Sequence, residues 1–411
     1  MKKRRGVHRV IPLLLLLLAA CESGGDGGTA GFALRDSAGI HIAESSAPAW
    51  SEGEGWTLGA APSVEIGVVE GAPEYQLGTV MGALRLASGE IAISNAASQE
   101  VRFYDPAGAY LRSVGRRGGG PGEFKGLGPI QVLQGDSLFA FDILQQRLSV
   151  FSPAGDFVRS VQMERTPDGG YPFAVGMLRD GSVIARVISS NGSASQGLQR
   201  STETYLRYSG DGKLRDTVTV QPGSERFIQS QSGEGGMMRG SITTPLFGHL
   251  RVMAVGADRL VFGGNESYEL AIYTPEGVLE RLVRRRQPAR PVTPEALDAL
   301  LKTRLDRISD PARRQQMERT YAEIPHPETM PFYETVMLDD ESNLWVREFQ
   351  PPPAGPPAWT VFDPDGRVLG AVSMPDDFRP TQIGRDFVLG IWNDDMDVQH
   401  VRMYALEKHA N

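Results

Sequence analysis

The chain has 411 residues and is 40% hydrophobic and 22% charged, with a formal net charge of −8, 48 glycines, 28 prolines and one cysteine. This hydrophobic fraction predicts a folded core, and the lone cysteine excludes a disulfide-based scaffold. The acidic balance argues against general nucleic-acid binding. The length does not require two domains, because closed all-β architectures often exceed the average domain size.

Residues 1–31 have the pattern of a secretion signal followed by a tether. Five positive charges precede the apolar run at residues 10–20: Lys2, Lys3, Arg4, Arg5 and Arg9. The apolar run is shorter than the roughly 20 residues that span a membrane. It ends in LAAC, in which Cys21 is the only cysteine of the chain. Without the five signal charges, 37 basic residues face 50 acidic ones, a net charge near −13.

The LAAC ending resembles the lipobox of bacterial lipoproteins. The resemblance implies a signal peptide at residues 1–20, lipid attachment at Cys21 and a flexible tether at residues 21–31. The chain would then be anchored in the cell envelope, on the periplasmic face of the inner or outer membrane or at the cell surface. An ordinary signal peptide with an incidental cysteine is the alternative.

Residues 32–407 contain two kinds of hairpin that alternate along the chain. One kind has a turn that closes on glycine, as in RFYDPAGAYLRSV. Its copies lie at residues 33–43, 102–114, 149–161, 206–218, 271–283 and 360–372. The second kind has a polar turn between apolar strands, at residues 86–93, 133–141, 178–186, 255–263, 338–346 and 383–391. Glycine supplies the positive φ that tight turns require.

An inner hairpin followed by an outer hairpin makes a four-stranded unit, and six such units predict an all-β, six-bladed β-propeller. The last inner hairpin is followed by a single strand, VQHVRMYAL, at residues 398–406. The segment GIHIAES at residues 39–45 is the expected fourth strand of this blade. Pairing the two ends of the chain would close the ring. A two-sheet sandwich is the competing fold.

The stretch GRRGGGPGEFKG at residues 115–126 raises the question of a phosphate-binding loop. A phosphate loop lies between a strand and a helix, whereas the segment that follows here, PIQVL, has the pattern of a strand. We therefore interpret the stretch as a connection between blades. With the FDILQQRLSVF segment, it resembles NHL-type propeller repeats. The resemblance implies that Asp142 and Arg147 form the structural pair of that repeat.

Two segments interrupt the repeat pattern. Residues 222–245 are rich in Gly, Ser and Gln and are predicted to form a loop. Residues 286–325 are predicted to form a helical insertion between blades 4 and 5, with Thr293 as the N-cap of its first helix and Asp310 before its second. Residues 284–319 carry ten basic and five acidic side chains. This segment is interpreted either as a basic flap that meets phosphates or an acidic partner, or as a segment that docks on the propeller's own acidic surface.

The sequence shows no recognisable catalytic set. The five histidines beyond the signal are scattered, so neither a metal site nor another cofactor is expected. The acidic stretch at residues 393–397 lacks the glycine and the closing glutamate of a calcium loop.

Propellers bind ligands at one mouth of the central channel, which the connections to the innermost strands build. These connections carry aromatic side chains that are able to stack on a ligand, together with a few cations. The candidate binding residues are Tyr75, Phe124, Lys125, Tyr171, Phe247, His249, Tyr333 and Arg379. Packing between blades is the competing role of the aromatic residues.

The sequence therefore predicts a membrane-anchored propeller that binds a protein, peptide or glycan. A propeller enzyme, either a lactonase-like hydrolase or a lyase with a metal in the channel, is the alternative. A structural subunit of an envelope complex that docks through the helical insertion is a third possibility.

Overall fold

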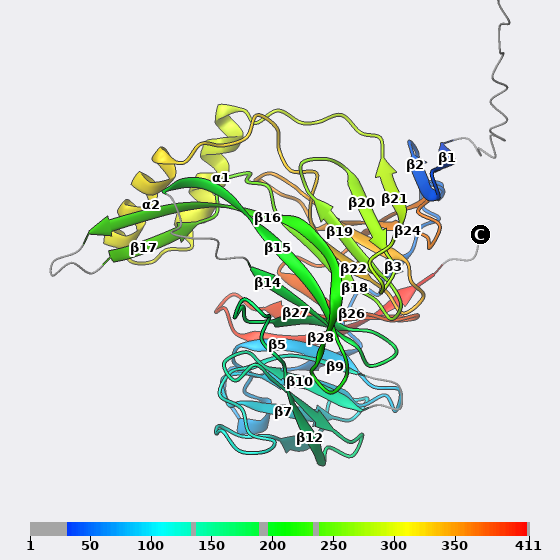
Figure 1. Ribbon diagram of the computed structural model, residues 1–411, viewed down its shortest axis with the longest axis vertical. Helices are drawn as coiled ribbons and strands as arrows, with labels where there is room; N and C mark the ends of the chain where they lie inside the picture. The colour runs from blue at the N-terminus through cyan, green and yellow to red at the C-terminus, as the bar shows by residue number, and fades with distance from the viewer. Residues whose placement is uncertain (1–30, 133–136, 189–195, 233–237, 409–411) are drawn as a thin grey trace, which may run out of the picture.

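The computed structural model describes residues 31–132, 137–188, 196–232 and 238–408. The proposed lipid-attachment residue, Cys21, the signal peptide and most of the tether lie outside these residues. The described chain forms an all-β propeller with a small helical insertion, as the sequence predicts (Figure 1).

The described strands form six sheets, which we number as blades 1 to 6 along the chain. Each blade begins with its innermost strand. Blade 1 contains β5 (Val80–Arg85), β6 (Ile91–Asn95), β7 (Glu100–Tyr104) and β8 (Tyr110–Val114), and blade 2 contains β9 (Leu127–Val132), β10 (Leu138–Asp142), β11 (Arg147–Phe151) and β12 (Phe157–Gln162). Blade 3 contains β13 (Phe173–Met177), β14 (Val183–Ile188), β15 (Gly197–Tyr208), β16 (Leu214–Ser232) and β17 (Met238–Thr243), and blade 4 contains β18 (Arg251–Val255), β19 (Leu260–Gly264), β20 (Glu269–Tyr273) and β21 (Leu279–Arg285). Blade 5 contains β22 (Tyr333–Leu338), β23 (Leu344–Glu348), β24 (Ala358–Phe362) and β25 (Val368–Ser373), and blade 6 contains β26 (Phe378–Ile383), β27 (Phe387–Asn393) and β28 (Gln399–Glu407).

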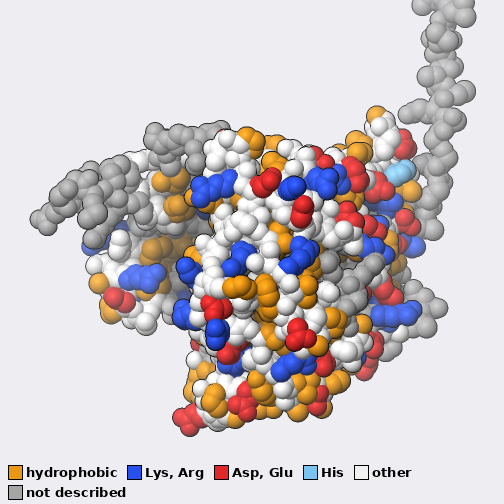
Figure 2. All heavy atoms as spheres, turned by 60° about the horizontal axis from the view of Figure 1, so that its bottom comes forward, with side chains coloured by type: hydrophobic (Ala, Val, Ile, Leu, Met, Phe, Trp, Pro, Cys, Tyr) orange, Lys and Arg blue, Asp and Glu red, His pale blue; other side chains and the backbone are white. Residues whose placement is uncertain are grey.

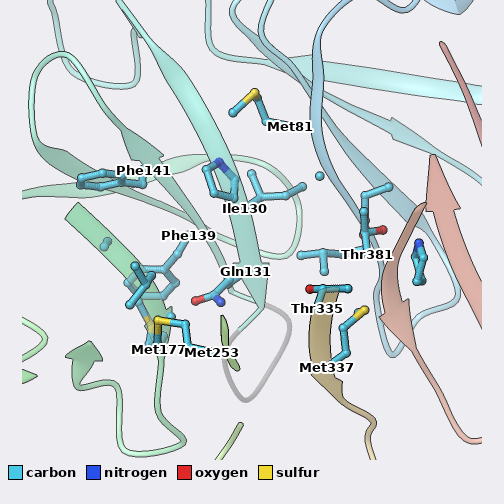
Figure 3. Close-up of a pocket in the computed structure, with 18 of the residues that line it drawn as sticks. Met81, Ile130, Gln131, Phe139, Phe141, Met177, Met253, Thr335, Met337 and Thr381 are labelled. Carbon is cyan, nitrogen blue, oxygen red and sulfur yellow. The ribbon is translucent and has the colours of Figure 1, made fainter. Parts of the chain in front are cut away.

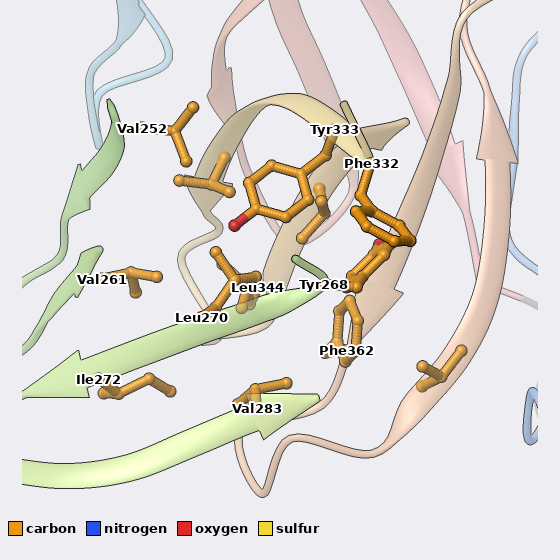
Figure 4. Packing of buried hydrophobic residues seen from close by; sticks show 13 residues of the cluster. Val252, Val261, Tyr268, Leu270, Ile272, Val283, Phe332, Tyr333, Leu344 and Phe362 are labelled. Atoms are coloured by element: carbon orange, nitrogen blue, oxygen red, sulfur yellow. The ribbon is translucent and has the colours of Figure 1, made fainter. Parts of the chain in front are cut away.

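The core is a ring of apolar clusters, one at each interface between neighbouring blades. In the cluster of Figure 4, Leu270 and Val283 of blade 4 pack against Tyr333 and Leu344 of blade 5. The second strand of a blade is covered on both faces, and all five residues of β6 and of β10 are buried. Strands buried on both faces lose the alternation of a surface strand, which explains apolar runs such as LFAF in blade 2.

The ring is closed by an N-terminal strand other than the predicted one. Residues 39–45 do not pair with the last strand. The short strand β4 (Val64–Ile66) does, with Ile66 opposite Val401 and Val64 opposite Met403. Val64 and Ile66 are buried, whereas Glu65 points outward and pairs with Arg402. The strand β3 (Thr57–Leu58) extends this pairing to Leu406.

The predicted closing segment instead belongs to a hairpin that extends blade 4. The strands β1 (Phe32–Ser37) and β2 (Ile40–Ser45) pair with each other, and β2 lies parallel to β21. Ala43 on β2 is fully buried, and Glu44 pairs with Arg35 and Arg286. The alternating pattern of residues 39–45 therefore predicted a strand correctly but gave it the wrong partner.

An arm extends to one side of the ring (Figure 1). It contains the long β15–β16 hairpin, β17 and the helices α1 (Pro294–Asp306) and α2 (Pro311–Glu323). The prediction of a loop at residues 222–245 is wrong for most of this segment, because β16 continues to Ser232 and pairs with β17. Within the arm, β16 is joined to α2 by a hydrogen bond from Gln229 Nε2 to Glu323 Oε2 (2.8 Å).

The helices begin at the predicted capping residues. Asp310 Oδ1 accepts hydrogen bonds from the N–H groups of Ala312 and Arg313 at the start of α2. Leu300 of α1 packs with Leu246, Phe247 and Phe349 of the propeller connections. The insertion therefore docks on the propeller through an apolar contact, and not through the acidic surface that one of the two sequence-based interpretations expected.

Replacing Thr293 by alanine is expected to weaken the start of α1 by about 1 kcal/mol, because Thr293 Oγ1 accepts from the Ala296 N–H. Hydrogen exchange of the first-turn amides should become about fivefold faster. The matched control is Thr303→Ala, since Thr303 Oγ1 donates to Ala299 O inside the helix. Equal acceleration in both variants would show that the cap does not stabilise the helix.

Candidate functional site

The glycine-rich loop at residues 115–126 is held by its own hydrogen bonds and by blade 2. Gly115 has φ +83°, and a Cβ there would meet Phe124 Cε2 at 2.5 Å, so this corner requires glycine. Gly118 N–H donates to Phe124 O, and Gly120 N–H donates to Glu123 Oε2. These amide groups already have acceptors, and the loop leads into β9 and not into a helix, so the geometry is that of a connection between blades.

Asp142 and Arg147 lie opposite each other at the end of the β10–β11 hairpin, and both form hydrogen bonds to this loop. Asp142 Oδ2 accepts from Lys125 N–H (2.8 Å), and its Oδ1 accepts from Leu144 and Gln145 N–H. Arg147 Nη2 donates to Gly120 O and Glu123 O. Both side chains therefore act as cross-links between blade 2 and the loop before it.

Both arginines of the loop have a partner within the protein. Arg116 pairs with Glu123 (2.7 Å), and the hydrogen bond from Gly120 N–H, followed by that from Arg116, holds the pKa of Glu123 below its ordinary value. Arg117 Nη2 donates to Ala97 O at 3.3 Å. The two arginines therefore each make a contact that holds the loop in place.

Most of the predicted rim aromatics are packing residues. Phe124, Phe247 and Tyr333 are at most 3% exposed and belong to three different apolar clusters. Tyr333 Oη donates to backbone oxygens of blade 4, and burial raises the pKa of its hydroxyl. Tyr75 is half-buried against Tyr104, and its Oη accepts from Tyr110 N–H. These rings join neighbouring blades, so they are not free to stack on a ligand.

The remaining polar candidates lie away from the central cavity, with one exception. Lys125 is exposed on the glycine-rich loop, and Tyr171 is 46% exposed under the guanidinium of Arg165. His249 Nδ1 lies 3.0 Å from Glu225 Oε1, at the base of the arm. Only Arg379, at the start of β26, lines the cavity.

The central cavity has a volume of about 750 Å³ and is lined by the innermost strands of all six blades. This volume is in the range of small-molecule sites in proteins. Figure 3 shows Met81 and Ile130 of blades 1 and 2 on one side, and Thr335 and Thr381 of blades 5 and 6 on the other. The cavity is thus a site that only the closed ring creates.

The wall formed by blades 1 to 3 is mostly apolar, with Gln131 and Arg186 as its polar residues. Ile130, Phe139, Phe141 and Val183 line it together with Met81 and Met177. Two more methionines, Met253 and Met337, come from blades 4 and 5. Methionine side chains are flexible and polarisable, so a wall of this composition adapts to apolar ligands of different shape.

The wall formed by blades 5 and 6 is rich in hydrogen-bond donors. Glu334 pairs with Arg347 at 3.1 Å. Arg379 is an exposed residue whose side chain has no hydrogen bond or ion pair among the described residues, and partial desolvation by the surrounding protein lowers the pKa of its guanidinium. The indole N–H of Trp359, a 2% exposed residue that also lines the cavity, has no partner in the described part of the chain either.

A third arginine, Arg186 of blade 3, reaches the cavity from the apolar side. Its Nη1 lies 3.5 Å from Glu203 Oε1, and Glu203 is buried behind it and accepts from Tyr205 Oη (2.7 Å). Arg186 and Arg347 are therefore each matched by one carboxylate, which leaves Arg379 as the cavity arginine without a counter-charge among the described residues.

Bulges in the innermost strands shape the cavity. The pairing of the innermost strand with its neighbour shifts register in blades 1, 2, 3, 5 and 6. Regular strands alternate their side chains between two faces, whereas a bulge re-aims them. In blade 5 the shift lies between Tyr333 and Thr335, and the consecutive residues Glu334 and Thr335 both line the cavity.

The channel continues to the opposite mouth of the ring. A second hollow of about 790 Å³ is lined by the turns that follow the innermost strands, and it shares Leu84, Gln131 and Met177 with the first. Arg179, Asp339 and Asp340 lie around this mouth. The carboxylate of Asp339 accepts hydrogen bonds from the side chains of Asn343 and Trp345. Burial, and then the charge of Asp339, raises the pKa of Asp340. The two mouths thus differ in charge pattern.

The outer surface has no single-sign field on the face shown in Figure 2, where basic and acidic side chains are interspersed. Within the described ranges, no three His, Cys, Asp or Glu side chains are grouped closely enough to hold a metal ion. Among these same residues, no helix is both long enough and apolar enough to cross a bilayer.

Trp359, Arg347 and Glu334 were not among the sequence-based candidates. The prediction concentrated on aromatics at the starts of the innermost strands, and these turned out to face the blade interfaces. Glu334 follows the predicted residue Tyr333 on the same strand. Because successive side chains of a strand point to opposite faces, this alternation could have indicated Glu334 once Tyr333 was assigned to the blade interface. Arg347 and Trp359 lie on the second and third strands of blade 5, and no local pattern marks them as channel residues.

Comparison with known proteins supports the fold. No family model matches the chain, and no curated protein matches it. Three solved structures, each 11% identical to the chain, are similar: a member of the DUF4221 family from Bacteroides vulgatus (TM-score 0.51, 87% of this chain and 99% of that one), a Bacteroides fragilis protein named as exported (TM-score 0.47, 89% and 99%) and virginiamycin B lyase from Staphylococcus aureus (TM-score 0.41, 86% and 100%). At this identity the first similarity concerns the fold alone, and the two with lower TM-scores carry no argument. The conclusion from the described sheets and this similarity is that the chain is a β-propeller.

Proposed function

We propose that this protein is a lipid-anchored propeller of the bacterial cell envelope that binds a small ligand inside its central channel. The observation that carries the proposal is the cavity of about 750 Å³, which has one mostly apolar wall and one donor-rich wall. The N-terminal pattern that ends at Cys21 supports the anchor, and the Asp142–Arg147 arrangement supports kinship with NHL-type repeats.

The size of the cavity narrows the ligand classes that the sequence suggested. A folded partner protein would not fit into this volume, whereas a small molecule or the end of a peptide would. The rim aromatics offered for glycan stacking are packed between blades. A small amphipathic ligand therefore matches the lining better than a glycan.

Larger side chains that fill the cavity are expected to prevent ligand binding. Met81 and Met253 come from blades 1 and 4, which are opposite each other in the ring, so the double substitution Met81→Trp and Met253→Trp narrows the channel from both sides. Native mass spectrometry of the full chain, isolated from bacterial membranes in mild detergent, is expected to show a bound mass that the double variant loses. The lost mass identifies the ligand directly.

The control is Met396→Trp, which adds an indole at a side chain that is 65% exposed and does not line the channel. This variant should keep the bound mass, and all three proteins should unfold cooperatively at similar temperatures. A wild-type chain without any bound mass, or a mass that persists in the double variant, would refute binding in the channel.

A further inference from the structure

The charge and hydrogen-bond balance of the cavity defines the class of ligand. We propose that the cavity binds an amphipathic monocarboxylate, with the carboxylate at Arg379 and the apolar body against the methionine-rich wall. This inference rests on the proposed function, because it requires the central cavity to be the ligand site.

The first argument is the excess of donors on the wall of blades 5 and 6. The Arg379 guanidinium offers five N–H groups and has no acceptor among the described residues, and the Trp359 N–H has none either. Arg347 has one carboxylate, that of Glu334. Donors without a protein acceptor are complementary to a ligand that accepts hydrogen bonds, and an ionised carboxylate matches the guanidinium geometry.

The second argument is the number of charges. Arg186 and Arg347 are paired with Glu203 and Glu334, respectively, so Arg379 provides a single uncompensated positive charge. A ligand with one negative charge neutralises it, whereas a dianion would leave an unpaired charge in a partly desolvated cavity. Arg379 is exposed and lines the cavity, so its guanidinium is accessible to a ligand.

The third argument is the direction of the polarity. Arg379 is the second residue of β26, close to the mouth that the connections between blades surround. Met177 and Met337 lie near the ends of β13 and β22, deeper in the channel. A ligand that enters by this mouth would keep its carboxylate near Arg379 and bury its apolar body between the methionines.

The experiment compares three ligands that share an eight-carbon chain: octanoate, 1-octanol and octylamine. Isothermal titration calorimetry with the full chain is expected to show that octanoate binds at least tenfold more tightly than octanol, and that octylamine binds most weakly. The substitution Arg379→Gln should reduce the affinity for octanoate to that for octanol. The affinity for octanol itself should change less than twofold, which shows that the variant cavity is intact.

Two further variants make the result specific. Arg379→Lys keeps the charge and should retain most of the preference for octanoate. Arg179→Gln removes an arginine at the opposite mouth of the same channel and should leave all affinities within twofold. An equal loss in Arg179→Gln and Arg379→Gln would overturn the assignment, because the effect would then come from the overall charge.

The outcomes separate this inference from the proposed function. Equal binding of octanoate and octanol, with both blocked by the Met81→Trp and Met253→Trp pair, would refute the carboxylate and leave the cavity as the ligand site. Octanoate binding that the same double variant does not affect would place the ligand elsewhere and refute both. Failure of octanoate to bind the wild-type chain would refute the carboxylate inference, and the bound-mass experiment then tests the cavity independently.

Discussion

A chain that begins at residue 71 is expected not to form a stable propeller, whereas a chain that begins at residue 47 is expected to unfold in one cooperative transition. The shorter chain lacks β3 and β4, and with them the buried side chains of Trp50, Val64 and Ile66. Burial of a large apolar side chain contributes about 1.5–3 kcal/mol. The loss is therefore comparable to the total stability of a typical protein, roughly 5–15 kcal/mol.

The longer chain is the matched control because it lacks β1 and β2, which extend blade 4, but keeps β3 and β4, which complete blade 6. To isolate β4 itself, Val64→Asp and Ile66→Asp are introduced together into the chain that begins at residue 47. These substitutions bury two carboxylates at the interface of blades 6 and 1 and should abolish the cooperative transition seen by circular dichroism or calorimetry. Equal midpoints for the chains that begin at residues 47 and 71 would show that β4 does not close the ring.

Replacing Asp142 by alanine should destabilise the protein by about 3 kcal/mol or more. The substitution removes the acceptor of four hydrogen bonds, from the N–H groups of Lys125, Leu144 and Gln145 and from the Gln145 side-chain amide. A buried donor without a partner costs about 1–3 kcal/mol. Asp142→Asn keeps one acceptor oxygen and should lose about half as much in urea unfolding, whereas the exposed Asp156→Ala of the same blade should lose less than about 0.5 kcal/mol.

The effect of Asp142→Ala should also depend on pH. Burial by itself raises the pKa of Asp142, but the hydrogen bonds from Gln145, Lys125 and Leu144 outweigh it, so the folded-state pKa is lower than the ordinary value. A lowered carboxyl pKa stabilises the fold above the unfolded pKa, and this contribution disappears as the pH falls through the folded pKa. The difference between wild type and variant should therefore shrink below about pH 4. A constant difference from pH 7 to pH 3 would contradict this role of the ionised carboxylate.

Repeated local patterns made the fold predictable to a large extent. Each hairpin has its own turn, as in DPAG at residues 105–108, and its own apolar strands, so six inner hairpins could be found without tertiary information. The helix starts at Thr293 and Asp310 could also be predicted from the sequence, because a capping side chain bonds to the backbone of the next few residues. The closing strand could not be predicted, because a three-residue segment such as VEI is too short to show the alternation of apolar and polar residues that marks a strand.

The proposed binding site could be predicted only in part. The sequence analysis expected ligand contacts at the channel mouth and included Arg379, which lines the cavity, but most of the aromatic residues that it named pack between blades. Aromatic side chains near strand starts have the same local pattern whether they face a ligand or a neighbouring blade. Which face of the strand points inward depends on the bulges, and five of the six blades carry one beside the cavity.

The amino-acid sequence by itself determined the all-β class, the succession of hairpins and the interruption by two helices, because turns, alternation and capping act over a few residues. The tertiary structure alone decided that β4 and not β2 completes blade 6, and that Glu334, Arg347, Trp359 and Arg379 meet at one wall. These residues come from different strands and two blades. They become neighbours only when the ring closes, and that closure depends on packing between segments that are more than 300 residues apart in the chain.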